Sequence, residues 1–222
     1  MEYKSIDYSQ WGFSGQGKNI LKFLTDSEKK IWDASLQYQD SRKGETGHGE
    51  VVTYFALKLL KYIRGDGDIV IPAAILHDVG WSQLTETERN LFYEEGDDNF
   101  GKKIWKRYEP ILRARHQEQG VKLAENLLIQ IDYFRQDISE IIEIISQHDT
   151  REEFLNDNDG IVRDADKLWR FTLPGFNIPT QIRKQNSLQY REFMLNKIKE
   201  EGFFYSDVSK KIAEIELSNI KN

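Results

Sequence analysis

A chain of 222 residues can bury a sizeable core, and 39% hydrophobic with 31% charged residues is the balance of a folded, water-soluble protein. No apolar run approaches the roughly 20 residues that span a bilayer, and the polar segment 1–10 lacks a signal-peptide core, so we expect a cytoplasmic protein without a membrane partner. A net charge of −6 without a basic tract argues against a long nucleic-acid partner, and the absence of cysteine excludes disulfides and thiolate metal sites.

Helical periodicity dominates the sequence and alternating strand patterns are scarce, which predicts an all-α protein. No repeat or Pro/Gly-rich linker divides the chain, so we expect a single domain over residues 1–222. The first predicted helix is capped by Asp26 or Ser27 and ends near Gln39. The composition sets no oligomeric state.

The remaining predicted helices follow from apolar residues at helical spacing and from capping residues. In chain order they span 48–63, 69–79, 110–131, 137–148, 161–171, 180–200 and 206–220. The helix over 69–79 is almost wholly apolar, which predicts a central position. Pro110 suits the first position of its helix. The charged and aromatic segment 82–108 is expected to form short helices and a loop, and 157–160 a surface turn.

The chain has four histidines, and a helical wheel places each of them on an apolar face. They are His48, His77, His116 and His148. One such histidine alone is more typical of a hydrogen-bonded core residue than of a ligand. Four buried histidines without a common partner would each lose hydration, which costs free energy at four separate positions. Neutral imidazole is a preferred nitrogen ligand of divalent transition metals, so a shared metal centre is the better explanation.

Two of the histidines precede an aspartate, as His77-Asp78 and His148-Asp149. Asp78 follows a segment too apolar to hold an unpaired carboxylate, which favours a metal ligand there. Asp149 stands at a predicted helix end, where we expect it to be exposed.

Several phrases in one order resemble the HD-domain metallohydrolase superfamily over about residues 48–172. They are HGEVVTYFALKLL, IPAAILHDVGW, RARHQEQGVKLAENLL, IIEIISQHD and IVRDADKLWRF. The resemblance implies an HD-domain helical bundle with N- and C-terminal helical extensions. It also implies one metal bound by His48, His77, Asp78 and a late aspartate, and a second bound by His116 and His148 with Asp78 bridging.

The late aspartate is Asp164 or Asp166. On a helical wheel the two lie on opposite edges of one apolar face, so geometry leaves both open. The family phrase of Ala-Asp, a basic residue and Leu aligns with residues 165–168 and favours Asp166, with Asp164 as an outer acid.

Four imidazoles and two carboxylates suit Mn, Fe, Co, Ni or Zn in one or two ions, with Mg possible if only the first site fills. The resemblance implies a metal-dependent phosphohydrolase that cleaves a small phosphate ester, such as a nucleotide, with metal-activated water beside Asp78. Cations are needed to stabilise phosphoryl charge. Lys167 is the first candidate, and the others are Arg113, Arg115, Arg151 and Arg163.

Two alternatives remain open at this point. Some HD-type proteins with six protein ligands are diiron oxygenases, but these often carry lysine in His-Asp-x-Gly-Lys, where this chain has Trp81. Cyclic-dinucleotide phosphodiesterases share that lysine, and their Gly-Tyr-Pro motif does not occur here. The other alternative is a non-catalytic metal-binding regulatory module, whose usual mark would be the loss of a ligand.

Overall fold

The computed structural model describes residues 3–7, 19–41, 44–90, 99–182 and 185–220, and every regular element in these ranges is helical. The predicted all-α class is confirmed. The helices of the central bundle are α2 (Asp26–Ser35), α3 (His48–Leu59), α4 (Gly67–Leu76), α6 (Asn99–Gln130), α7 (Arg135–Gln147) and α8 (Asp157–Trp169). A short 3-10 segment, η1 (Ile20–Lys22), precedes them, and η2 (Leu36–Tyr38), η3 (Val79–Gln83) and α5 (Glu86–Asn90) lie between them.

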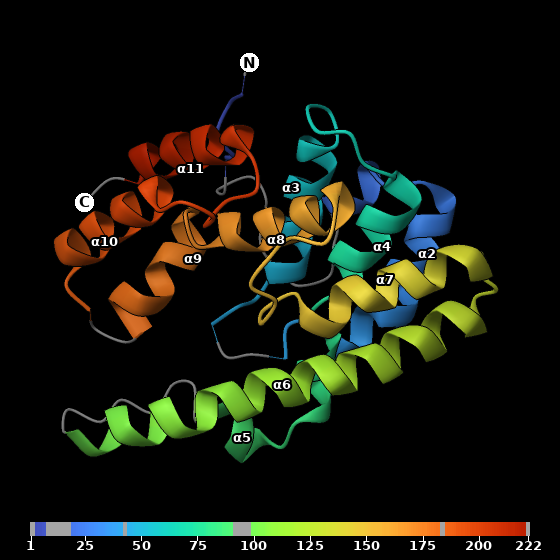
Figure 1. Ribbon diagram of the computed structural model, residues 1–222, viewed down its shortest axis with the longest axis horizontal. Coiled ribbons are helices and arrows are strands. Elements are labelled where there is room, and N and C mark those ends of the chain that lie inside the picture. The colour runs from blue at the N-terminus through green and yellow to red at the C-terminus, as the bar shows by residue number, and fades with distance from the viewer. Residues whose placement is uncertain (1–2, 8–18, 42–43, 91–98, 183–184, 221–222) are drawn as a thin grey trace.

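Helix α4 lies at the centre of the bundle and contacts α2, α3, α7 and α8 (Figure 1). Its residues 69–76 are all buried, as the apolar sequence predicts. Asp66 caps its first turn by accepting a hydrogen bond from the backbone N–H of Asp68. The buried centre thus carries its C-terminal end, with His77 and Asp78, into the interior.

Two helices begin earlier than predicted because a residue farther upstream provides the cap. Thr25, not Asp26 or Ser27, caps α2 through a reciprocal capping box with Glu28. Asn156 caps α8 by accepting from the Asp159 N–H, so residues 157–160 form the first turn of α8 instead of a surface turn.

The prediction for Pro110 was wrong in register. Helix α6 begins at Asn99, and Pro110 lies inside it. Figure 1 shows α6 as one long helix. A proline removes a single backbone donor, and a helix of this length can continue past that loss. Within the described residues, no helix combines the length and the apolar character needed to cross a membrane.

The predicted helix over 180–200 is interrupted. Helix α9 (Leu173–Asn177) continues into a π-helical turn, η4 (Ile178–Ile182), and α10 (Ser187–Lys199) starts anew. Asn186 begins α10 by accepting from the N–H groups of Leu188 and Gln189. Helix α11 (Asp207–Asn219) then packs against α10 and α8.

Candidate metal centre

Six side chains converge at the ends and inner faces of five helices. His48 is the first residue of α3, His77 ends α4, Asp78 follows it, His116 lies within α6, His148 ends α7, and Asp166 lies in α8. All four histidines are buried. The structure therefore brings together the six residues that the sequence favours as ligands.

Asp78 lies between two pairs of histidines. Its Oδ2 atom is 3.3 Å from Nε2 of His48 and 3.7 Å from Nε2 of His77. Its Oδ1 atom is 3.5 Å from Nε2 of His116 and 3.4 Å from Nε2 of His148. Each oxygen of one carboxylate thus faces a different histidine pair, so Asp78 would be able to serve two ions, one with each oxygen.

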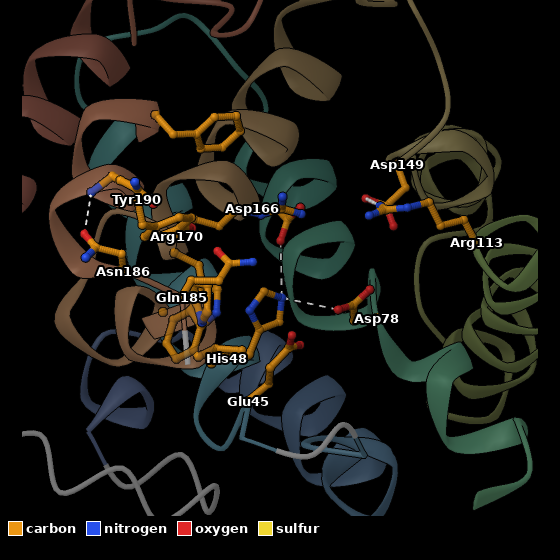
Figure 2. Close-up of a pocket in the computed structure, with 16 residues that line it drawn as sticks. Glu45, His48, Asp78, Arg113, Asp149, Asp166, Arg170, Gln185, Asn186 and Tyr190 are labelled. Carbon is orange, nitrogen blue, oxygen red and sulfur yellow. Dashed lines mark hydrogen bonds and ion pairs between the residues drawn. The ribbon is translucent and has the colours of Figure 1, made fainter. Parts of the chain in front are cut away.

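The two late aspartates of α8 face opposite sides. Asp166 Oδ1 lies 3.3 Å from Nε2 of His48, and a dashed line in Figure 2 joins the two side chains. The same oxygen lies 3.7 Å from Nε2 of His77. Asp164 instead accepts the backbone N–H groups of Tyr205 and Ser206, at 2.7 and 3.0 Å. The geometry therefore favours Asp166 as the ligand and makes Asp164 an anchor for the C-terminal extension.

Three of the histidine rings are oriented by a backbone carbonyl one turn earlier in their own helix. The Nδ1 contacts are His77 with Ala74 (2.8 Å), His116 with Leu112 (3.4 Å) and His148 with Ile145 (2.9 Å). A ring that donates Nδ1–H to a carbonyl presents an unprotonated Nε2, the tautomer that binds metal. In all three the Nε2 atom faces Asp78.

These donors fit divalent ions. Two ligand atoms about 2.1 Å from one ion, at tetrahedral or octahedral angles, lie about 3.0–3.4 Å apart. The Nε2 atoms are 3.0 Å apart for His48 and His77 and 3.5 Å apart for His116 and His148. Two groups are close enough to share an ion, one of His48, His77 and Asp78 and one of Asp78, His116 and His148.

The imidazoles and carboxylates of the site shift one another's pKa values. Burial by itself lowers the pKa of His48, but hydrogen bonds to Asp166 and Asp78 outweigh it and raise the pKa to about 10. Burial likewise opposes the charged form of His148, yet Asp78 and Asp149 raise its pKa to about 9. Burial favours protonation of Asp78, but the charge on His77 and the other histidine contacts hold the pKa of Asp78 well below its usual value.

We expect metal binding to strengthen with pH, because a metal ion must displace the protons on His48 and His148. Both folded-state pKa values lie above the ordinary 6.5 of histidine. The protonated forms of His48 and His148 therefore stabilise the metal-free folded protein to their full extent below about pH 6.5. This stabilisation is lost as the pH rises through the pKa of His148, about 9, and that of His48, about 10. The increase in Tm caused by Mn²⁺ should therefore be larger at about pH 8.5 than at about pH 6.5. Equal increases in thermal melts with Mn²⁺ or chelator would contradict this linkage.

Trp81 supports the second histidine pair in a way that the sequence did not reveal. Its indole Nε1–H donates to Asp78 Oδ1 at 3.1 Å, and its ring stacks on His116 with centroids 4.2 Å apart. Gly80, the residue before Trp81, allows the backbone to lie close to that of His116, since a Cβ added at Gly80 would lie 1.9 Å from the carbonyl oxygen of His116. Trp81 therefore orients the Asp78 oxygen and the imidazole that would share the second ion.

Replacing Trp81 with phenylalanine keeps an aromatic ring but removes the donor to Asp78. We expect metal affinity at the second group to fall about tenfold, as for other residues that orient ligands, with the first group unchanged. Calorimetric titration with Mn²⁺ would resolve the two affinities. Trp32→Phe is the matched control, because Trp32 is buried in α2 and its indole nitrogen has no hydrogen-bond partner in the described residues. If both Mn²⁺ affinities of Trp81→Phe equal those of the wild-type protein, Trp81 does not orient the ligands of the second group.

The expectation of an exposed Asp149 was wrong. Its side chain is only 13% exposed, and its Oδ2 lies 3.6 Å from Nε2 of His116. Arg113 pairs with Asp149 at 2.8 Å. Burial alone would raise the pKa of Asp149, but the charges of His148 and Arg113 lower it. The signal in the sequence was the second His-Asp pair, together with an arginine one turn before His116.

Two of the proposed catalytic cations lie elsewhere. Lys167 donates to the carbonyl of Phe203 and packs against the ring of Phe154. Arg115 is half exposed and pairs with Glu88. Neither residue lines the cavity beside the histidines, so both assignments need correction. Of the other arginine candidates, Arg151 and Arg163 bind groups on or near the 151–159 segment and α7.

A cavity of about 570 Å³ opens beside the centre (Figure 2). One side consists of the candidate ligands and their neighbours, namely Glu45, His48, Asp78, Arg113, Asp149 and Asp166. The other side is formed by residues between Trp169 and Phe193. A small molecule can therefore reach His48 and the carboxylates of the site.

Comparison with family models matches residues 47–170 to the HD domain. No curated protein and no solved structure matches the chain. The matched segment covers more than half of the sequence and includes all four histidines, Asp78 and Asp166. The chain therefore belongs to the HD-domain superfamily of metal-dependent phosphohydrolases.

Proposed function

We propose that this protein is a metal-dependent phosphohydrolase that cleaves a small phosphate ester, such as a nucleotide. The supporting observation is the placement of Asp78, whose two oxygens face two separate pairs of imidazole Nε2 atoms at the floor of an open cavity. His48, His77, Asp78 and Asp166 would hold one divalent ion. Asp78, His116 and His148 would hold a second.

Bound ions would lower the pKa of a water molecule and neutralise phosphoryl charge. The donor set suits Mn, Fe, Co, Ni or Zn, with Mg at the first group if only that one fills. The residues themselves keep the site ordered: three backbone carbonyls hold the imidazole tautomers, and Trp81 holds one oxygen of Asp78.

Arg113 and Arg170 take the place of Lys167 and Arg115 in this proposal. Both arginines line the cavity, Arg113 beside Asp149 and Arg170 at the end of α8. A guanidinium can donate two parallel hydrogen bonds to phosphoryl oxygens, which favours arginine for this role. Asp149 pairs with Arg113 and lies beside His116 of the second histidine pair.

The test is phosphate release from the chelator-treated protein after addition of each metal. Substrates are p-nitrophenyl phosphate, glycerol phosphate and the nucleoside monophosphates. We expect release that depends on metal and is lost in Asp78→Ala, but kept in Asp207→Ala, which removes an exposed aspartate from α11. Metal-loaded protein without phosphate release would overturn the proposal. Oxygen consumption by the iron form would favour the oxygenase instead. Inactivity in both assays would favour a regulatory module.

A further inference from the structure

The far side of the cavity is built by the C-terminal extension. Its residues between Leu173 and Phe193 lie beyond the segment 47–170 that matches the HD domain. Figure 2 shows Gln185, Asn186 and Tyr190 across the cavity from Asp78 and Asp149. This surface lies outside the matched segment and faces the candidate metal centre. We call it the α10 wall, formed by Gln185, Asn186, Gln189, Tyr190 and Phe193.

The α10 wall combines aromatic rings with amide groups. The rings of Tyr190 and Phe193 are nearly parallel, 25° apart, with centroids separated by 6.1 Å. Phe193 is 52% exposed although it lines a cavity. Gln185 and Gln189 add exposed amides that can both donate and accept hydrogen bonds. Exposed aromatic groups beside amides are suited to a flat ring with polar edges.

Charge divides the cavity into two halves. The carboxylates that line it, Glu45, Asp78, Asp149 and Asp166, belong to the half with the histidines. The described residues of the α10 wall contain no carboxylate, and Arg170 lies next to Trp169 at the boundary. A substrate would therefore place its phosphoryl group at the metal half and an uncharged group against the wall.

The size of the cavity agrees with this division. A volume of about 570 Å³ lies in the range of sites that enclose an organic ligand of substantial size. A phosphoryl group with its metal ions would fill only the half lined by His48 and the carboxylates. The remaining space must accommodate the alcohol part of the ester, which leaves as the product.

We propose that the α10 wall binds the leaving group of the substrate, and that this group carries a planar ring with hydrogen-bonding edges, of the kind found in nucleosides. This inference rests on the proposed phosphohydrolase function and adds the residues that select the substrate. Phe193 and Tyr190 contact the face of the ring, and Gln189 binds its edge. These residues determine specificity and take no part in the chemical step.

The test compares two double variants of α10. Gln189→Ala with Phe193→Ala removes wall groups, whereas Leu188→Ala with Leu195→Ala removes two exposed side chains of the same helix that do not line the cavity. We expect the wall variant to raise KM for nucleoside monophosphates about tenfold with kcat nearly unchanged, because loss of one stacking contact costs about that much affinity. Its KM for glycerol phosphate should stay at the wild-type value, and the control should match wild type throughout.

Calorimetric binding of free nucleosides to the purified protein tests the wall without turnover. We expect saturable binding that weakens at least about fivefold in the wall variant and is retained in the control. If nucleosides bind in this way but no ester is hydrolysed, the phosphohydrolase function is rejected and the assignment of the α10 wall as a binding surface for a planar ring is supported. If esters are hydrolysed but the wall variant changes neither KM nor nucleoside binding, the wall assignment is overturned. Absence of nucleoside binding to the wild-type protein also overturns it.

Discussion

Replacing Asp78 with alanine should remove both metal sites together. The two oxygens of this one carboxylate face both histidine pairs, so its loss deprives each group of its shared anionic ligand. We expect metal content to fall from up to two ions per chain to near zero, and phosphate release to fall by about a thousandfold or more. Elemental analysis of dialysed protein and a phosphate-release assay measure the two effects.

Asp149→Ala is the control for this prediction. Asp149 approaches only the second pair, at 3.6 Å from His116 and 3.9 Å from His148. Its loss should lower occupancy at that group alone and leave at least one ion bound. Equal metal loss in the two variants would show that Asp78 does not bridge. Circular dichroism of both variants checks that each retains its helical fold.

Replacing Asp166 with asparagine should empty the first metal group and nearly abolish hydrolysis. Asparagine keeps the shape and one oxygen but loses the charge that balances the ion next to His48 and His77. We expect occupancy at the second group to persist. Metal analysis together with turnover measures this effect, and wild-type metal content in Asp166→Asn would reject the assignment.

Asp164→Asn offers a matched comparison two residues away in α8. Asp164 is buried and accepts the N–H groups of Tyr205 and Ser206, so asparagine weakens the attachment of the C-terminal extension. A loss of about 1–3 kcal/mol should lower Tm by about 3–10 °C. Metal content should stay unchanged. Lys167→Ala belongs to the same class, because Lys167 binds the Phe203 carbonyl, and it should lower Tm more than turnover. Greater metal loss in Asp164→Asn than in Asp166→Asn would reverse the assignment of α8.

The sequence by itself determined the helical class, most of the bundle helices and the nominated ligands. These properties are local: apolar residues recur at helical spacing, and each histidine lies on the apolar face of its own helix. Helix ends were predicted less well, because a cap depends on one side-chain contact. The caps at Thr25 and Asn156, and the continuation of α6 through Pro110, illustrate this.

Only the tertiary structure decided which face of α8 meets the histidines. Asp164 and Asp166 are about 200° apart on the helix, and both border its apolar face, so periodicity cannot separate them. The packing of α3 and α4 on one side and residues 205–206 on the other assigns one aspartate to each environment. The placement of Arg113, Asp149 and the α10 wall has the same origin. These groups come from separate parts of the chain and line one cavity. A local sequence pattern cannot predict contacts between such distant segments.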